Sequence, residues 1–292
     1  MTFNRELEDI KDRIEGYLTS IISYENTEKT IADAMKYSLL AGGKRVRPVL
    51  CLAIAKALGG DIKKALPFAV SIECIHTYSL IHDDLPAMDN DDLRRGIPTS
   101  HKKFGEANAI LAGDGLLNLS YEIIFNELEK SNFDPYCAKI GSVISKAAGF
   151  KGMIAGQVID IESENKQVNL ERLVEMHTKK TGALIKAACI TGAIGAKRED
   201  VLEKVSEYGE NIGLVFQIVD DILDCTGESS VLGKMVGSDS QNDKSTFVSL
   251  IGIEESWNLS RKLTNKAIII ADELDSTGFL TNYTKYLLNR KS

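Results

Sequence analysis

Apolar residues recur at spacings of three and four along most of this chain, and this periodicity constrains its fold more than any other feature. One stretch shows it at Leu66, Ala69, Val70, Ile72, Cys74 and Ile75. Apolar and polar residues that alternate over five or more positions, which would indicate strands, are hard to find. The sequence therefore predicts an all-α protein.

The helices are expected between breaks rich in glycine, proline and aspartate, such as Gly42-Gly43 and Phe133-Asp134-Pro135. The segment 182–195 is apolar on more than one face, which indicates burial among other helices. No break is long enough for an interdomain linker, so a single domain over 1–292 and one large bundle are expected. The expected helices are 4–23, 28–40, 46–58, 63–84, 105–129, 134–149, 151–162, 169–178, 182–195, 199–225, 245–273 and 278–289.

Composition excludes several classes of protein. The formal net charge of −7 disfavours a nucleic-acid partner, because such binding needs a surplus of Lys and Arg. Five cysteines without a CxxC pair suggest neither a disulfide framework nor a zinc site, and they fit a cytoplasmic location. The first ten residues are too polar for a secretory signal, and no run of eighteen apolar residues occurs, so no membrane insertion is expected.

An aspartate cluster, Asp220-Asp221-Ile222-Leu223-Asp224, falls in a strongly helical and apolar segment. Asp220 and Asp224 are four residues apart, so both carboxylates project from one helix face and repel each other. A divalent cation between them would remove that repulsion. Taken alone, the string fits an exposed acidic helix end equally well.

A second aspartate cluster, His82-Asp83-Asp84-Leu85-Pro86-Ala87-Met88-Asp89, has a wider spacing. Pro86 disfavours helical geometry at the residue before it, so the helix should end near Asp84. Asp89 would then fold back from the loop and share a metal with Asp83, an arrangement that Mg²⁺ tolerates because it keeps several waters. The alternative is an acidic, solvated loop. His82 is expected to be structural.

Basic residues gather in two places within this acidic chain. One is Gly42-Gly43-Lys44-Arg45-Val46-Arg47-Pro48, and the other is Asp92-Leu93-Arg94-Arg95-Gly96. Forked guanidinium groups and lysine point charges both suit diphosphate oxygens. Lys180, Lys234 and Lys244 are further candidates, although each alone would be a surface lysine. His76 lies seven residues before Asp83, on nearly the same helix face, where a structural role is the alternative.

Taken together, these residues resemble the polyprenyl (isoprenyl) diphosphate synthase family, and the string from Ala69 to Ala112 is most similar to its bacterial farnesyl diphosphate synthases. The shared motifs occur in the family's order: GGKRVRP, DDx4D followed by LRRG and GEANAILAGD, KKTGAL, FQIVDDILD, LGK and DKST. The resemblance implies an isoprenoid-synthase-like bundle with a central cavity. It also implies a homodimer.

The resemblance assigns roles to particular residues. Those of the two aspartate-rich motifs would hold Mg²⁺ against the allylic diphosphate: Asp83, Asp84, Asp89, Asp220, Asp221 and Asp224, with Asp83, Asp84, Asp89, Asp220 and Asp224 as metal ligands. Contacts to isopentenyl diphosphate match Lys44, Arg47, His76 and Arg95. Contacts to the allylic diphosphate match Arg94, Lys180, Thr181, Gln217, Lys234 and Lys244, of which Lys180 would also be catalytic. Asp243 departs from the family's usual glycine.

The implied reaction is a magnesium-dependent head-to-tail condensation of isopentenyl diphosphate with dimethylallyl or geranyl diphosphate through an allylic cation. Tyr78 lies about one and a half turns before Asp83 on the same helix, where a ring would close the floor of an apolar pocket. The resemblance links Tyr78 and Ser79 to product length and implies farnesyl diphosphate, with geranylgeranyl diphosphate as the alternative. Tyr78 as a plain core aromatic remains open.

Two other functions compete with this reading. A class I terpene cyclase would carry an Asn/Ser/Glu-type second metal motif, whereas this chain has DDILD. A non-catalytic synthase subunit would be favoured by eroded aspartates or a missing RRG, and both motifs are intact. We therefore expect an enzyme.

Overall fold

The computed structural model describes residues 2–226 and 245–289, and this part of the chain consists of helices joined by loops, with one short hairpin. The predicted all-α class is confirmed. The α-helices are α1 (Phe3–Ser20), α2 (Lys29–Leu39), α3 (Val46–Ala57), α4 (Ile62–Asp83), α5 (Ser100–Phe104), α6 (Glu106–Lys130), α7 (Pro135–Ala148), α8 (Met153–Ser163), α9 (Leu170–His177), α10 (Ala183–Gly195), α11 (Leu202–Thr226), α14 (Phe247–Leu274) and α15 (Phe279–Leu288). That the whole chain forms one domain stays a prediction.

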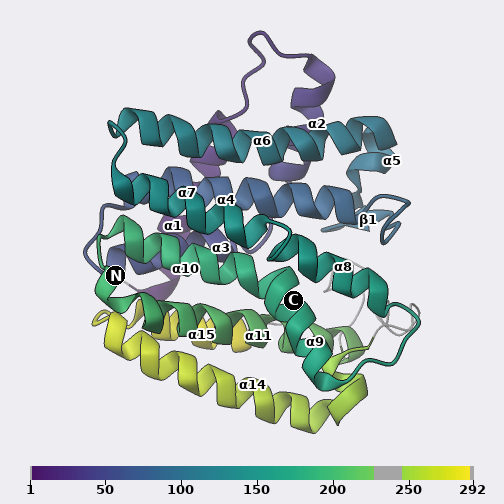
Figure 1. Cartoon of the computed structure of the whole chain (residues 1–292), viewed down its shortest axis with the longest axis vertical. Helices are drawn as coiled ribbons and strands as arrows, with labels where there is room; N and C mark the ends of the chain where they lie inside the picture. Colours follow the sequence, from purple (N-terminus) through teal and green to yellow (C-terminus); the bar gives the residue numbers. More distant parts are fainter. Residues whose placement is uncertain (1, 227–244, 290–292) are drawn as a thin grey trace.

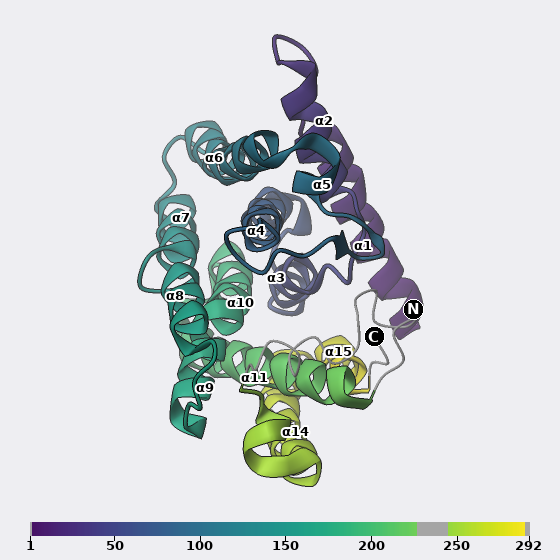
Figure 2. The ribbon, with the colours of Figure 1, turned by 90° about the vertical axis from the view of Figure 1, so that its right-hand side faces the viewer.

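Two helices form the centre of the bundle (Figures 1 and 2). Figure 2 looks along α3 and α4, which lie inside a ring that contains α1, α6, α7, α10 and α11. The buried side of the ring is apolar, and α10 is buried on several faces, as its sequence predicted. At Gly192 of α10 a Cβ atom would lie 2.4 Å from the carbonyl oxygen of Cys51, so glycine permits this close contact with α3. Among the described helices, none combines the length and apolarity needed to cross a bilayer.

Side-chain caps mark several helix starts near the predicted breaks. Asp61, Asp134 and Asn169 each accept a hydrogen bond from a backbone N–H in the first turn of the helix that follows. Thr246 forms a reciprocal capping box with Ser249 at the start of α14. Such caps satisfy N–H groups that have no partner within the helix, so local sequence alone located these ends closely.

The loop after α4 has the predicted shape. The helix ends at Asp83, three residues before Pro86, and the N–H of Asp89 donates to the carbonyl oxygen of Asp83 at 2.9 Å. The chain therefore folds back, as the wide aspartate spacing indicated.

A β-hairpin follows this loop and was not predicted. Strands β1 (Leu93–Arg94) and β2 (Ile97–Pro98) pair antiparallel, with Arg95 and Gly96 between them at φ 55° and 77°. Two adjacent residues with positive φ are typical of a tight hairpin turn. Strands of two residues are too short to show alternation, which is why the sequence pattern missed them. The short helix α5 was missed for the same reason.

Three other expectations about helices were wrong in detail. The break expected between 178 and 182 is a π-helical turn, η1 (Thr178–Gly182), which joins α9 directly to α10. The helix expected over 245–273 contains a non-helical residue, Gly252, at φ 79°. The segment expected as helix from 199 begins with a 3₁₀ turn, η2 (Glu199–Val201). All three are local departures that apolar periodicity does not record.

Candidate active site

Two adjoining cavities lie beside the C-terminal end of α4. The polar cavity, about 310 Å³, is lined by carboxylates and cations from α3, α4, the loop 84–94, α8, η1 and α11. The apolar cavity, about 500 Å³, lies among α4, α6 and α8. Both are lined by Arg47, His76, Leu80, Asp83, Lys180 and Thr181. The charged space therefore continues directly into the apolar one.

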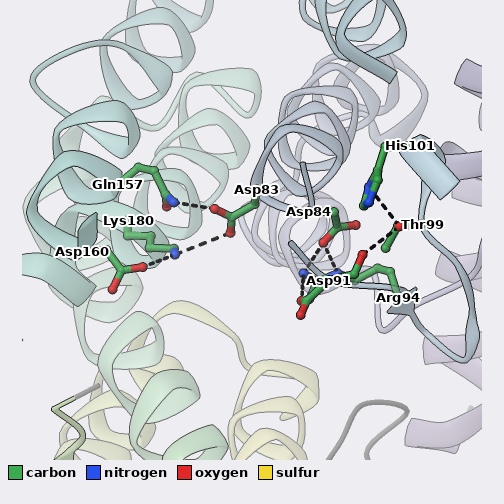
Figure 3. A network of polar contacts seen from close by, with 9 residues as sticks. All are labelled: Asp83, Asp84, Asp91, Arg94, Thr99, His101, Gln157, Asp160 and Lys180. Atoms are coloured by element: carbon green, nitrogen blue, oxygen red, sulfur yellow. Dashed lines mark hydrogen bonds and ion pairs between the residues drawn. The ribbon is translucent and has the colours of Figure 1, made fainter. Parts of the chain in front are cut away.

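Asp83 lines both cavities, and Figure 3 shows its contacts with Gln157 and Lys180. One carboxylate oxygen accepts a short hydrogen bond from Gln157, and the other lies 3.5 Å from the Nζ of Lys180. Lys180 also donates to Asp160 at 2.6 Å. Burial raises the pKa of Asp83, and Lys180 opposes that shift. Burial lowers the pKa of Lys180, but Asp83 and Asp160 outweigh it and the net shift is upward, so the ammonium stays charged.

Asp84 points away from both cavities, because successive residues on a helix are rotated by about 100°. The residue is only 3% exposed, and its carboxylate accepts from the Nε of Arg94 at 2.9 Å. Burial raises the pKa of Asp84 to about 6. Arg94 also donates to Asp91 at 2.9 Å (Figure 3) and lines the polar cavity. Asp84 therefore holds Arg94 at the cavity wall.

The second aspartate motif faces the first from α11. Asp220 and Asp221 line the polar cavity. Asp221 accepts from the Nε2 of Gln217 at 3.0 Å and from the N–H of Phe247, at the start of α14, at 2.9 Å. Asp224 is 4% exposed and lines neither cavity, and one of its oxygens accepts no hydrogen bond from the described part of the chain.

Buried basic groups form another wall of the polar cavity. Burial, reinforced by the charge of Arg95, lowers the pKa of Arg47 to about 10, against the attraction of Glu73. Within the described residues the Nε of Arg47 has no hydrogen-bond partner. Burial and the nearby arginines lower the pKa of His76 well below its usual value, so its imidazole is neutral. This wall is suited to an anionic group, because Arg47 can still donate.

The other cations of the predicted diphosphate contacts lie elsewhere. Arg95 donates to the carbonyl oxygen of Gly42 and packs on Gly43, where a Cβ atom would lie 2.7 Å from the guanidinium carbon. The Nζ of Lys44 lies 5.6 Å from the ring centroid of Phe216. Neither Arg95 nor Lys44 lines the polar cavity. Lys234 and Lys244, the loop segment 227–240 and Asp243 fall outside the described residues.

Among the described residues, no group of three or more His, Cys, Asp or Glu side chains is gathered closely enough to hold a metal ion. The polar cavity instead presents separate carboxylates, including Asp83, Asp89 and Asp220. Such oxygen donors fit Mg²⁺, which keeps several waters and is commonly bound by one or two carboxylates together with substrate phosphate. The residues therefore fit an ion that arrives with its substrate.

Gln157, Asp160 and His177 are functional-site residues that the sequence analysis missed: Asp160 and His177 line the polar cavity, and Gln157 lines the apolar one. Gln157 and Asp160 are three apart in the otherwise apolar stretch Met153–Ile161, and polar side chains on one face of such a helix are a usable signal. His177 stacks on Phe247 with ring centroids 5.5 Å apart. Nothing local in its sequence distinguishes it.

Tyr78 and Ser79, which the resemblance links to product length, both line the apolar cavity. Tyr78 is 7% exposed, and burial raises its pKa to about 12, so the phenol stays protonated. The opposite wall comes from α6 and α8: Leu117, Met153, Ile154, Val158 and Ile161. Tyr78 is thus part of the hydrophobic core and also borders the apolar cavity.

Comparison with known proteins agrees with this arrangement. The model of the polyprenyl synthetase family matches residues 28–276. The chain is 41% identical to farnesyl diphosphate synthase of Escherichia coli, with 99% of each chain covered. It is 45% identical to large subunit 1 of the heterodimeric geranylgeranyl pyrophosphate synthase of Arabidopsis thaliana, which covers 89% of this chain and 72% of the relative.

A solved structure is similar over the whole chain. Geranyltransferase of Helicobacter pylori, crystallised with magnesium and isoprenyl diphosphate, has a TM-score of 0.86 at 36% identity, and the match covers 99% of this chain and 97% of the other. Sequence and structure thus lead to the same conclusion: this chain belongs to the polyprenyl synthetase family.

Proposed function

We propose that this prenyl diphosphate synthase makes farnesyl diphosphate from isopentenyl diphosphate and dimethylallyl or geranyl diphosphate, with Mg²⁺ as cofactor. The observation that carries the proposal is the continuity of the two cavities through Asp83 and Lys180. An allylic diphosphate has a charged head and an apolar tail joined at the reacting carbon. The two cavities offer matching surroundings for these two parts. The predicted site residues that line the polar cavity are proposed in the roles that the resemblance implies for them.

Lys180, Arg94 and Arg47 supply positive charge along the polar cavity, where diphosphate oxygens would bind. The donors of Lys180 and Arg94 are set in place before substrate arrives, because Asp160 holds Lys180 and Asp84 holds Arg94. Prearranged donors in a partly water-free site stabilise developing charge without a cost of reorganisation during the reaction. When bound, Mg²⁺ would add further positive charge to the diphosphate oxygens.

The proposed reaction begins when the allylic carbon–oxygen bond breaks and its electron pair leaves with the diphosphate. The resulting allylic cation lies against the apolar walls of α4, α6 and α8, which exclude water that would otherwise trap it. The double bond of isopentenyl diphosphate then forms the new carbon–carbon bond. A proton leaves the condensed product for the released diphosphate, so no protein nucleophile is needed.

Product length follows, in this proposal, from the depth of the apolar cavity. Tyr78 at its boundary supports farnesyl diphosphate. Relatives named for farnesyl and for geranylgeranyl products have similar identity to this chain, so geranylgeranyl diphosphate is the alternative product.

The deciding experiment incubates the enzyme with isopentenyl diphosphate and labelled dimethylallyl or geranyl diphosphate, with and without Mg²⁺. Chain length is read from the dephosphorylated products. We expect farnesol, formed only when Mg²⁺ is present. Geranylgeraniol would retain the reaction class but reject the assigned product length, and no elongation would reject the proposed function.

A homodimer and a cytoplasmic location are part of the same proposal. Ile110, Leu111 and Phe125 on α6 are 44%, 55% and 63% exposed, and apolar exposure on one helix supports an interface with a second copy. Light scattering on the purified protein gives the oligomeric state directly.

A further inference from the structure

His82 is the residue of the apolar cavity that the roles above leave unexplained. It follows Tyr78 by one helical turn on α4, and both side chains line the apolar cavity. Its side chain is 28% exposed. A polar ring in the wall of an apolar space needs a partner that holds it in place.

That partner is the backbone of α6. The Nε2 of His82 lies 3.0 Å from the carbonyl oxygen of Ile110. A carbonyl oxygen only accepts, so Nε2 carries the proton and donates. The same nitrogen is 3.9 Å from a carboxylate oxygen of Asp114. The imidazole is therefore tied to α6 although it belongs to α4.

Glycine at position 113 is what lets the imidazole reach that carbonyl group. A Cβ atom at Gly113 would lie 2.1 Å from Nε2 and 2.4 Å from Cδ2 of His82. Separations this small are not possible between non-bonded atoms, so any side chain at 113 must displace the ring. The ring occupies the space that the missing side chain leaves.

On its other side, the imidazole meets the ring of Tyr78. The two centroids are 5.7 Å apart and the planes are inclined at 78°, an edge-to-face contact. The chain of contacts thus runs from Gly113 and Ile110 of α6, through His82, to the aromatic ring that bounds the cavity.

We propose that His82 is a positioning residue for product length: held by α6, it fixes the ring of Tyr78 at the boundary of the apolar cavity. The inference rests on the proposed function. Without the imidazole, the ring of Tyr78 gains room between α4 and α6 and the cavity deepens. With a side chain at Gly113, the imidazole is pushed toward Tyr78 or into the cavity, which becomes shallower.

Substitutions at His82 and at Gly113, which contact each other, should change product length in opposite directions, and this provides the test. His82→Ala is expected to raise the ratio of geranylgeranyl to farnesyl product roughly three- to tenfold, the scale of one aromatic pair. Gly113→Ala is expected to raise the ratio of geranyl to farnesyl product to a similar degree. In the double variant the clash is absent, so its products should match those of His82→Ala.

The matched control is Gly115→Ala on the same helix, where the new methyl group meets the flexible side chain of Met35 outside both cavities. Its product ratios should stay within about twofold of the parent, since a flexible contact gives way easily. The melting temperature of each variant shows whether its fold is destabilised. Separate values of kcat and KM for geranyl diphosphate show whether its activity is generally reduced.

Unchanged product ratios in a folded His82→Ala would overturn the inference, and so would a double variant that keeps the short products of Gly113→Ala. If Gly113→Ala does not fold, His82→Ala still decides, because shortening a side chain introduces no clash. An unmodified enzyme that elongates nothing would instead overturn the proposed function itself, so the two failures are distinguishable.

Discussion

The polar and the apolar cavity share one wall but are built in opposite ways. In the polar cavity, charged side chains are held by other side chains, as Asp160 holds Lys180 and Asp84 holds Arg94. In the apolar cavity, the walls are aliphatic and aromatic groups from α4, α6 and α8. From this difference we expect the charge of the polar cavity to govern how fast the diphosphate leaves. The volume of the apolar cavity should govern how long the product grows.

The largest expected effect comes from removing charge where the cavities meet. Asp83→Asn keeps the size of the side chain but weakens the binding of any cation at this position. Turnover should therefore fall on the order of 10³-fold. Product length should not change. Asp92→Asn is the matched control, because that aspartate is largely exposed and pairs with Lys102. Steady-state kinetics with product analysis checks both. A shift in length with Asp83→Asn would mean that the two cavities are not separable.

Lys180→Met should lower kcat/KM by about 10²-fold, because an ammonium that faces the departing diphosphate is lost. The same substitution should strengthen the binding of Mg²⁺. The Nζ of Lys180 lies 3.5 Å from Asp83 and competes with any cation there. Without substrate, the variant should therefore bind Mg²⁺ roughly tenfold more tightly.

Calorimetry with Mg²⁺ alone measures that affinity. Lys179→Met is the neighbouring control, since Lys179 pairs with Glu175 at 2.7 Å and lies outside both cavities. Weaker Mg²⁺ binding by Lys180→Met would contradict the inference that Lys180 competes with a cation at Asp83.

Tyr78→Ala should lengthen the product without a comparable loss of rate. Removing the ring deepens the apolar cavity, so the share of products longer than farnesyl should rise on the order of tenfold. Chromatography of the dephosphorylated products measures the shift. Tyr24→Ala, at a tyrosine that is 50% exposed, is the control. If Tyr78→Ala still stops at farnesyl, another residue sets the length.

The smallest effect concerns His177, which lines the polar cavity yet packs like an apolar ring. Burial lowers its pKa from 6.5 to about 3. Between these values the unfolded chain binds a proton that the folded protein does not, so stability falls as pH falls through 6.5. His177→Phe should remove this loss, which approaches about 1.4 kcal/mol per pH unit. Urea unfolding from pH 7 to pH 4 tests it, and equal slopes for both proteins would exclude the assignment.

Local signals in the sequence located most of the fold. Helix starts at Asp61, Asp134 and Asn169 depend on contacts within a few residues, and such contacts can be read directly from the chain. The end of α4 before Pro86 is of the same kind. The hairpin at 93–98 and the π-helical turn at 178–182 were missed because neither leaves a periodic pattern.

For the candidate site, the sequence predicted which motifs take part but not how their individual side chains are oriented. The resemblance to the family implied that Asp83 and Asp220 belong to one site, and both line the polar cavity. The sequence did not distinguish Asp83 from Asp84, although one lines the cavity and the other faces Arg94. The direction of adjacent carboxylates depends on which helices pack on either side, and this is absent from any local pattern.

The sequence by itself determined the helical class, most helix ends and the kinds of residue that the candidate site contains. Periodicity, caps and motifs are properties of short segments, so they can be read without the fold. Only the tertiary structure decided that Gln157 and Asp160 of α8 meet Asp83 and Lys180, or that Gly113 of α6 makes room for His82. These contacts join residues far apart in the chain, and their distances are fixed by how whole helices pack.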